Sequence, residues 1–297
     1  MEFWQAILLG LFQGAMEVLP VSSTAHLVLL HNLMGTEGST LSFDVLMNFG
    51  SWLAVMIYLR EAWLDMVVGI LNFIKIRVYL FLQDKSWKHS VPGFHDMTVP
   101  YTKNAFYFQS RQHALWAWYL ILGTIPAGLV GFFFRSQIDD FLRTPFYVAL
   151  ALIIGGGLLW IADSMSRQQY TLENMRWTQA VFIGIGQILA LVPGFSRSGS
   201  TITAGLFAGF TRKDAATFSF LLGAPIVLAA TISSLPEFIS TYQFSLPTLA
   251  AFLASIGATF VSMHLFYQFI EKQSYLIFVI YRILLGSSIL VWMVFGR

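Results

Sequence analysis

The sequence contains no cysteine among its 297 residues. Disulfide bonds, thiolate metal sites and a cysteine nucleophile are therefore excluded. Charge is scarce as well: only 11% of the residues are Asp, Glu, Lys or Arg, whereas a soluble domain carries roughly 25%. The formal net charge of +2 gives no basic excess for binding nucleic acid, so no nucleic-acid partner is expected.

Apolar sequence is abundant instead, with hydrophobic residues making up 57% of the chain. A membrane-spanning helix needs about 20 mostly apolar residues. Stretches of this kind occur at 3–33, 41–59, 62–82, 113–134, 146–163, 178–211, 215–236, 246–270 and 274–296. The sequence therefore predicts an all-α fold, a polytopic membrane helix bundle in which residues 1–297 form one domain. The polar segment 83–112 is predicted to be an extramembrane loop.

Two of these stretches are interrupted by polar turns. Pro20 and a run of hydroxyl residues break the stretch 3–33, and Pro193-Gly194 with a similar run breaks 178–211. Irregular backbone inside a membrane is tolerated only where protein covers it or where it lines a watery cavity. Each stretch is therefore predicted to form two re-entrant half-helices whose turn faces a site.

The interrupted stretches also indicate an internal repeat. Gly10-Leu-Phe-Gln13 recurs as Gly184-Ile-Gly-Gln187, and in both copies a proline and a hydroxyl cluster follow. Interrupted helices at corresponding places in two halves are typical of inverted-repeat membrane proteins with a site near the midplane. We expect two inverted repeats, at about 1–82 and about 178–297.

Three isolated charges lie within the apolar stretches: Glu17, Arg197 and Arg282. A charge at the bilayer centre costs roughly 2.5–3.5 kcal/mol even on the lenient insertion scale, so each needs a physical reason. One interpretation is a structural ion pair between Glu17 and Arg197 that joins the two halves. The other is a polar cavity for a charged substrate, which we favour because these charges accompany hydroxyl-rich turns.

The residues around both turns suit an anion. Gln13 and Glu17 share one face of a helix, and His26 lies on the first turn of the helix after Pro20. Free N–H groups at the start of such a helix favour negative charge. Further donors are expected from Ser22, Ser23, Thr24, Gly194, Ser196, Ser198 and Thr201. With the planar guanidinium of Arg197, they predict a phosphate cradle without a Walker motif.

Asp44 and Asn48 form one more polar pair in an apolar stretch. They share a helical face and are candidates for the lining of the cavity. A role at the start of a helix explains Asp44 equally well.

Both turns resemble the signatures of a known family. The segment from Gln13 to His26 resembles a (Glu/Gln)-x-x-x-Glu signature that runs into Leu-Pro-Val-Ser-Ser-Thr-x-His. The segment from Pro193 to Thr201 resembles the signature Pro-Gly-x-Ser-Arg-Ser-x-x-Thr. Both belong to the bacitracin-resistance family of undecaprenyl-diphosphate phosphatases, and the resemblance extends through Ile280-Tyr-Arg282. Many members carry Glu where this chain has Gln13, which weakens a carboxylate role at that position.

The resemblance implies an enzyme that hydrolyses undecaprenyl diphosphate to undecaprenyl phosphate and inorganic phosphate. This reaction recycles the lipid carrier for peptidoglycan synthesis and confers bacitracin resistance. The resemblance also implies a multi-pass protein of the bacterial cytoplasmic membrane, a site that opens to the outer face, and a divalent cation, Mg²⁺ or Ca²⁺. The alternative is a polyprenyl-phosphate flippase or transporter, because broken helices at a midplane site are also transporter architecture. A homodimer is left open.

Phosphoryl transfer depends mainly on positioning and charge neutralisation, which suggests a role for each site residue. Arg197 is expected to contact the transferred phosphoryl group and Arg282 the lipid diphosphate. Glu17 would hold the metal ion, with Gln13 assisting through its carbonyl oxygen. Two versions of the attack stay open. In one, His26 is the nucleophile or activates water; in the other, Ser23 is the nucleophile and His26 its base.

Overall fold

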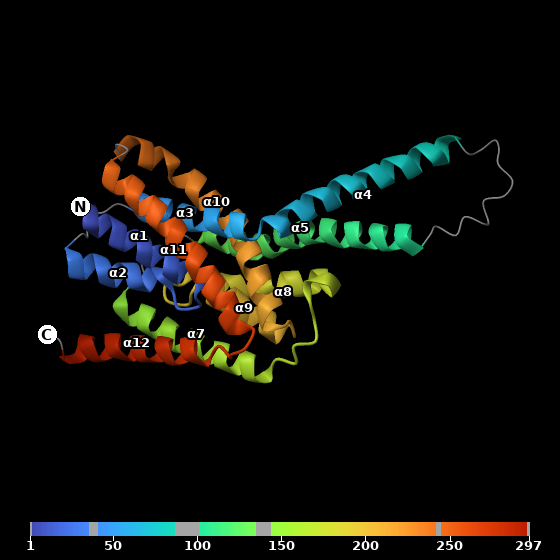
Figure 1. Ribbon diagram of the computed structural model, residues 1–297. Helices are drawn as coiled ribbons and strands as arrows, with labels where there is room; N and C mark the ends of the chain where they lie inside the picture. The colour runs from blue at the N-terminus through green and yellow to red at the C-terminus, as the bar shows by residue number, and fades with distance from the viewer. Residues whose placement is uncertain (1, 36–40, 87–100, 135–143, 242–244, 296–297) are drawn as a thin grey trace. The chain divides into compact units, whose positions relative to one another are not determined.

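A computed structural model of the chain describes residues 2–35, 41–86, 101–134, 144–241 and 245–295. Helices make up most of these ranges, and within them no β-strand occurs beyond an isolated bridge between Tyr170 and Phe210. The predicted all-α class is therefore confirmed. The helices are α1 (Phe3–Val18), α2 (Ser23–Met34), α3 (Leu41–Tyr58), α4 (Arg60–Ser86), α5 (Tyr101–Phe133), α7 (Pro145–Met165), η3 (Leu172–Asn174), α8 (Trp177–Gln187), η4 (Ile188–Leu191), α9 (Arg197–Phe207), α10 (Arg212–Thr241), α11 (Leu246–Ile270) and α12 (Leu276–Phe295) (Figure 1).

Five helical segments in the described part of the chain are long and apolar enough to cross a membrane. They are Arg111–Phe133, Pro145–Met165, Arg212–Ser234, Leu246–Ile270 and Leu276–Phe295. Five of the predicted stretches match them, which confirms the polytopic membrane bundle. The predicted span 62–82 lies within α4 and stays a prediction as a membrane crossing.

The segment 83–112 is not simply a loop. α4 continues to Ser86 and α5 begins at Tyr101, so the loop prediction was wrong for both ends of the segment. Charged residues such as Lys85 and Lys103 are good helix formers, and their presence does not argue against a helix. Residues 87–100 lie outside the described residues.

The chain divides into two compact units. One comprises Met1–Tyr58 and Leu122–Arg297, and the other comprises Leu59–Ile121. The second unit holds α4 and the first part of α5. Every residue that the sequence nominates for the site belongs to the first unit.

Both interrupted stretches form two half-helices separated by a turn. The chain leaves α1 after Val18 and doubles back as α2 from Ser23, while α8 and η4 are followed by α9 from Arg197. In Figure 1 the α1–α2 hairpin and the α8–α9 hairpin enter the bundle from opposite ends, and their turns lie near its middle. The two predicted re-entrant hairpins are therefore present, while the inverted repeats stay a prediction.

Small residues let α1 approach α11 closely. A Cβ atom added to Gly14 would collide with the backbone oxygen of Ser255. The hydroxyls of Thr259 and Ser262 donate hydrogen bonds to the carbonyl oxygens of Gly14 and Ala15, at 3.1 and 2.9 Å. Small residues and interhelical hydroxyl bonds are the usual means by which membrane helices associate. They hold α1 firmly, which fixes the carboxylate near its end.

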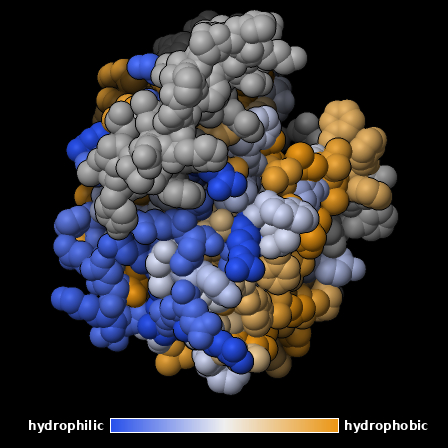
Figure 2. Space-filling view, turned by 90° about the vertical axis from the view of Figure 1, so that its right-hand side faces the viewer, coloured by the Kyte–Doolittle hydropathy of each residue, from blue (hydrophilic) through white to orange (hydrophobic). Residues whose placement is uncertain are grey.

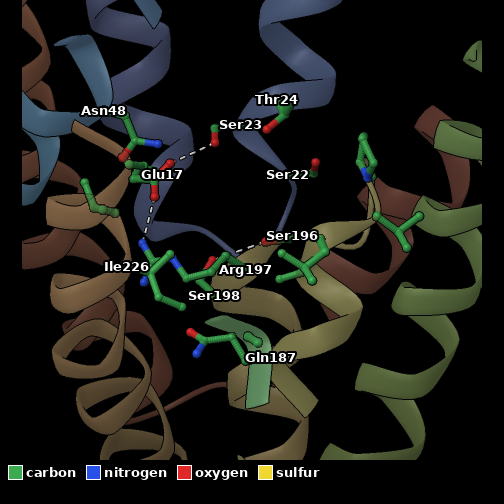
Figure 3. A pocket seen from close by; sticks show the side chains of 18 of the residues that line it. Glu17, Ser22, Ser23, Thr24, Asn48, Gln187, Ser196, Arg197, Ser198 and Ile226 are labelled. Atoms are coloured by element: carbon green, nitrogen blue, oxygen red, sulfur yellow. Dashed lines mark hydrogen bonds and ion pairs between the residues drawn. The ribbon is translucent and has the colours of Figure 1, made fainter. Parts of the chain in front are cut away.

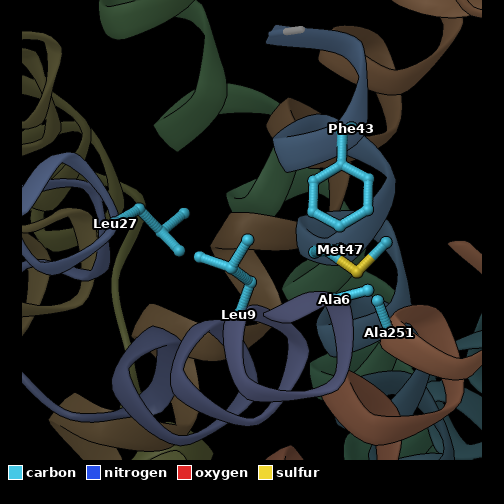
Figure 4. Close-up of a cluster of buried hydrophobic side chains, with 6 residues drawn as sticks. All are labelled: Ala6, Leu9, Leu27, Phe43, Met47 and Ala251. Atoms are coloured by element: carbon cyan, nitrogen blue, oxygen red, sulfur yellow. The ribbon is translucent and has the colours of Figure 1, made fainter. Parts of the chain in front are cut away.

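An apolar cluster stands beside this contact, as Figure 4 shows. It joins α1, α2, α3 and α11 through six buried side chains: Ala6, Leu9, Leu27, Phe43, Met47 and Ala251. The cluster ties α2 and α3 to α1, so the first turn is held on both sides.

Hydrophilic residues gather at the end of the first unit that faces the viewer in Figure 2. The loops after α7, α9 and α11 meet at this end, where Lys213 is ion-paired with Glu271 at 2.6 Å. Beneath them, Asp163 accepts two hydrogen bonds from Arg212, at 2.6 and 3.2 Å, and one from the backbone of Tyr275 at 3.0 Å. We call Asp163, Arg212 and Tyr275 the buried latch.

Candidate active site

The turn of each hairpin contains a serine with unusual backbone. Ser22 and Ser196 have φ angles of 71° and 69°, and each directly precedes the first residue of a half-helix. Such angles are uncommon for residues other than glycine, and this kind of strain persists where the surrounding structure enforces it, often at functional sites. Ser196 also caps α9, because its Oγ accepts a hydrogen bond from the backbone N–H of Gly199 at 3.1 Å.

The two turns meet through Glu17 and Arg197, as Figure 3 shows. Nη2 of Arg197 donates a hydrogen bond to Oε1 of Glu17 at 2.7 Å. The other carboxylate oxygen, Oε2, accepts hydrogen bonds from Gln13 at 3.1 Å and from the Ser23 hydroxyl at 2.8 Å. A further bond links the turns, from Ser198 Oγ to the carbonyl oxygen of Leu19 at 3.1 Å. The predicted convergence of an acidic and a guanidinium side chain is therefore present.

A cavity of about 220 Å³ lies beside this ion pair. Its polar lining includes Glu17, Ser22, Ser23, Thr24, Asn48, Gln187, Gly194, Ser196, Arg197 and Ser198. Its apolar wall includes Met16, Val45, Ala127, Ile226 and Val227. Of the predicted site residues, these include both members of the ion pair, the three hydroxyl residues after Pro20, and Gly194, Ser196 and Ser198. The ion pair therefore forms part of a polar cavity.

Two predicted residues support the ion pair from behind the lining. Gln13 is 2% exposed and is directed at Glu17. Thr201 is fully buried, and its hydroxyl donates to the carbonyl oxygen of Arg197 at 2.8 Å. It also bonds the hydroxyl of Ser219, whose own carbonyl oxygen accepts from Arg197 Nη1 at 3.3 Å. These contacts fix the direction of the guanidinium.

His26 is not among the residues that line the cavity. Its Nδ1 lies 2.8 Å from the carbonyl oxygen of Ser22, and its Nε2 bonds the hydroxyl of Tyr281, on which the ring also stacks. Because a carbonyl oxygen can only accept, Nδ1 carries a proton; in the neutral ring Nε2 then accepts from Tyr281. Both ring nitrogens are therefore engaged by protein groups. The geometry ties His26 to the strained turn rather than to the cavity.

Arg282 does not line the cavity either. It is fully buried, and its guanidinium donates to the carbonyl oxygens of five residues: Pro20, Ala151, Leu152, Gly194 and Phe195. Each of its three guanidinium nitrogens donates to a backbone oxygen, and the expected contact with the lipid diphosphate stays a prediction.

Two amides in the cavity carry buried polar atoms: Asn48, which the sequence nominated for the lining, and Gln187, which it did not assign to the site. The Oδ1 of Asn48 and the Oε1 of Gln187 are buried without a hydrogen-bond partner, and both residues line the cavity. Gln187 is 1% exposed. A buried oxygen without a donor costs about 1–3 kcal/mol, so these atoms are suited to a ligand. Gln187 corresponds to Gln13 in the sequence repeat, and this correspondence could have nominated it for the site.

The cation implied by the resemblance can be compared with these donors. No group of three or more His, Asp or Glu side chains suited to a metal occurs in the described ranges. Mg²⁺ is often held by one or two carboxylates together with substrate phosphate oxygens. Glu17 and the unpaired oxygen of Asn48 fit that pattern, whereas Gln13 does not line the cavity.

Known proteins match the chain along nearly its whole length. The profile of the family described as "Bacitracin resistance protein BacA" matches residues 6–288. The chain belongs to the BacA family. An undecaprenyl-diphosphatase of Alteromonas mediterranea is 37% identical over 300 residues, which cover 100% of both chains. An undecaprenyl-diphosphatase of Gemmatimonas aurantiaca is 36% identical over 286 residues, which cover 96% of each. The BacA match includes both turns and the cavity between them.

Proposed function

We propose that this protein is a phosphatase that hydrolyses undecaprenyl diphosphate to undecaprenyl phosphate and inorganic phosphate. The observation that carries the proposal is the Glu17–Arg197 pair, held at 2.7 Å in a cavity bordered by the starts of two half-helices. The names of the two full-length relatives support it, because both are undecaprenyl-diphosphatases. They favour hydrolysis over the flippase alternative.

Arg197 and the start of α9 bind the transferred phosphoryl group in this proposal. The side chain supplies a planar pair of N–H donors, which suits phosphate oxygens. The hydroxyls of Ser196 and Ser198 line the same cavity. When the diphosphate enters, the N–H donors of Arg197 leave the Glu17 carboxylate and bind phosphoryl oxygens. The carboxylate is then available to accept a proton.

We assign the attack to Ser23, with Glu17 as its base. The supporting observation is that the Ser23 hydroxyl lines the cavity and donates to Glu17 Oε2 at 2.8 Å. The Ser23 oxygen attacks the terminal phosphorus, and its proton passes to Glu17. The bond between that phosphorus and the bridging oxygen breaks, and the bridging oxygen leaves with the electron pair as part of the lipid monophosphate. Water then hydrolyses the phosphoserine and releases inorganic phosphate.

A divalent cation, Mg²⁺ or Ca²⁺, would be held by Glu17 and Asn48 together with the substrate. When bound, it would neutralise charge on the diphosphate oxygens. In place of the predicted direct ligation by Gln13, we assign this residue the role of orienting the Glu17 carboxylate, because its side chain donates a hydrogen bond to Glu17.

The cavity opens, in our proposal, to the outer face of the bacterial cytoplasmic membrane. Cytoplasmic loops carry an excess of Lys and Arg. The segments that follow α7, α9 and α11 hold, in or beside them, the basic residues Arg167, Arg176, Arg212, Lys213 and Lys272. Along α10, the lining residues Ile226 and Ala230 lie beyond Ser219, which contacts Arg197, and away from Lys213. This order along α10 supports a cavity that opens on the side opposite the basic loops. The homodimer stays a prediction.

The activity is tested by phosphate release from undecaprenyl diphosphate with purified protein in detergent. The expected result is release by the unchanged protein and none by Arg197→Ala. A flippase would release no phosphate. Addition of a chelator should abolish release if the substrate is hydrolysed with a bound cation, and unchanged turnover would remove the cation from the proposal.

The nucleophile is tested by trapping a phosphoenzyme from terminally labelled substrate. A phosphoserine survives acid, whereas a phosphohistidine on His26 is lost in acid. Ser23→Ala should remove the acid-stable label. Ser288→Ala is the matched control, because in the described part of the chain this hydroxyl bonds Leu285 O of its own helix.

A further inference from the structure

Arg282 is a buried cation without a partner of opposite charge. It is 0% exposed, and no salt bridge to it is found among the residues that the structure describes. Placing a charge in an apolar interior is strongly unfavourable unless the charge is paired or fully hydrogen-bonded. The contacts of the guanidinium therefore have to explain why a charge is tolerated at this position.

The guanidinium contacts both broken turns at once. Its Nη1 donates to Pro20 O at 3.2 Å, in the first turn. Its Nη2 donates to Gly194 O at 3.3 Å and Phe195 O at 2.8 Å, in the second turn. These carbonyl groups lie outside the helices. Inside a membrane, a carbonyl oxygen that has left its helix has no water to donate to it. Arg282 supplies donors to oxygens that the two breaks release.

Two glycines leave room for this side chain. A Cβ atom at Gly155 would collide with Nη2 of Arg282, and one at Gly199 would lie 2.6 Å from Nη1. The side chain also donates to Leu152 O and Ala151 O of α7, at 3.3 and 3.4 Å. The guanidinium is thus enclosed by α7 and the two turns.

We propose that Arg282 is a positioning residue that clamps the two turns together and sets the distance between Glu17 and Arg197. It acts through the backbone of the turns and does not touch the substrate. The clamp rests on the proposed phosphatase activity only for its kinetic consequences, since its structural role is measurable without substrate.

The kinetic test compares Arg282→Gln and Arg282→Lys with the unchanged protein. A displacement of reacting groups by about 1 Å can lower a rate by about a hundredfold, so kcat should fall on that order while KM stays within about threefold. Lysine should not rescue kcat, because one ammonium group cannot reach carbonyls in both turns. A rise in KM with kcat preserved would overturn the proposal and place Arg282 on the substrate.

Gly155→Ala tests the clamp while Arg282 is retained. The added methyl group displaces Nη2 and should lower kcat as Arg282→Gln does. Gly157→Ala is the matched control two residues along the same helix, where an added Cβ meets nothing within 4 Å. If the arginine variants do not fold, this pair decides the matter: equal kcat in both glycine variants would overturn the clamp.

A distance measurement separates the clamp from the activity. The chain has no cysteine, so spin labels at Leu11→Cys on α1 and Phe182→Cys on α8, both exposed positions, are unique. Arg282→Gln should broaden or shift the distance distribution between them, and an unchanged distribution would contradict the clamp. If the unchanged protein released no phosphate, the proposed function would fail, while this measurement would still decide the role of Arg282.

Discussion

Ser22 and Ser196 adopt the same left-handed backbone at the same point of two hairpins, each directly before a half-helix. Each also lies nine residues after a buried glutamine, Gln13 or Gln187. The two turns have nevertheless diverged in chemistry. Ser23 follows in the first and Arg197 in the second, so one turn carries the proposed nucleophile and the other the cation proposed to neutralise the phosphoryl group.

The Glu17–Arg197 pair should contribute to stability as well as activity. Glu17→Gln leaves a largely buried guanidinium without its partner, which should lower the free energy of unfolding by roughly 3 kcal/mol. The double variant Glu17→Gln with Arg197→Gln should recover part of that loss, because no charge is then left unpaired. Thermal unfolding in detergent measures both. Additive losses in the double variant would show that the two side chains are not coupled.

Gly223 should be required for the direction of the Arg197 side chain. A Cβ atom at this position would collide with the guanidinium of Arg197. Gly223→Ala should therefore lower kcat by about tenfold to a hundredfold, because the cation is displaced from the phosphoryl group. Gly128→Ala is the control, since its Cβ would meet nothing within 4 Å. Phosphate release is the measurement, and equal rates for both variants would refute the expectation.

Gln187 should matter for activity but not for folding. Replacement by methionine removes the unpaired Oε1 while keeping the length of the side chain. We expect reduced phosphate release together with a melting temperature that is unchanged or higher, because an unsatisfied buried oxygen is lost. A clear drop in melting temperature would mean that the amide is needed for structure instead.

The buried latch should affect stability alone. Asp163→Asn leaves Arg212 without its carboxylate and should destabilise the protein by about 3 kcal/mol. Lys213 and Glu271 form an exposed pair, so Glu271→Gln should leave the melting temperature unchanged. KM and kcat of both variants, measured below their melting temperatures, should equal those of the unchanged protein. A change in either constant would connect the latch to the cavity.

The helix breaks could be predicted from sequence because their causes are local. Proline has no backbone N–H and disrupts a helix, and a hydroxyl-rich run follows both Pro20 and Pro193, so together they indicate the two turns. The ends of the segment 83–112 could not be predicted in the same way, because polar composition indicates contact with water and does not exclude a helix.

The site could be predicted as far as motifs specify it. Glu17, Ser23 and Arg197 meet as expected. The orientations of His26 and Arg282 could not be predicted, because each depends on distant partners. His26 bonds Tyr281, 255 positions away, and Arg282 reaches Pro20 across 262 positions. A sequence pattern places a residue on a helix but does not say which distant backbone it will meet.

The two members of the ion pair come from different hairpins, and this affects the insertion of the growing chain. Glu17 and Arg197 are 180 positions apart, and their hairpins enter from opposite ends of the bundle. A growing chain therefore inserts an acidic side chain long before its basic counterpart has been synthesised. Until the second hairpin is inserted, that acid lacks its cationic partner. Insertion of the second hairpin therefore supplies the opposite charge and brings the two turns of the proposed site together.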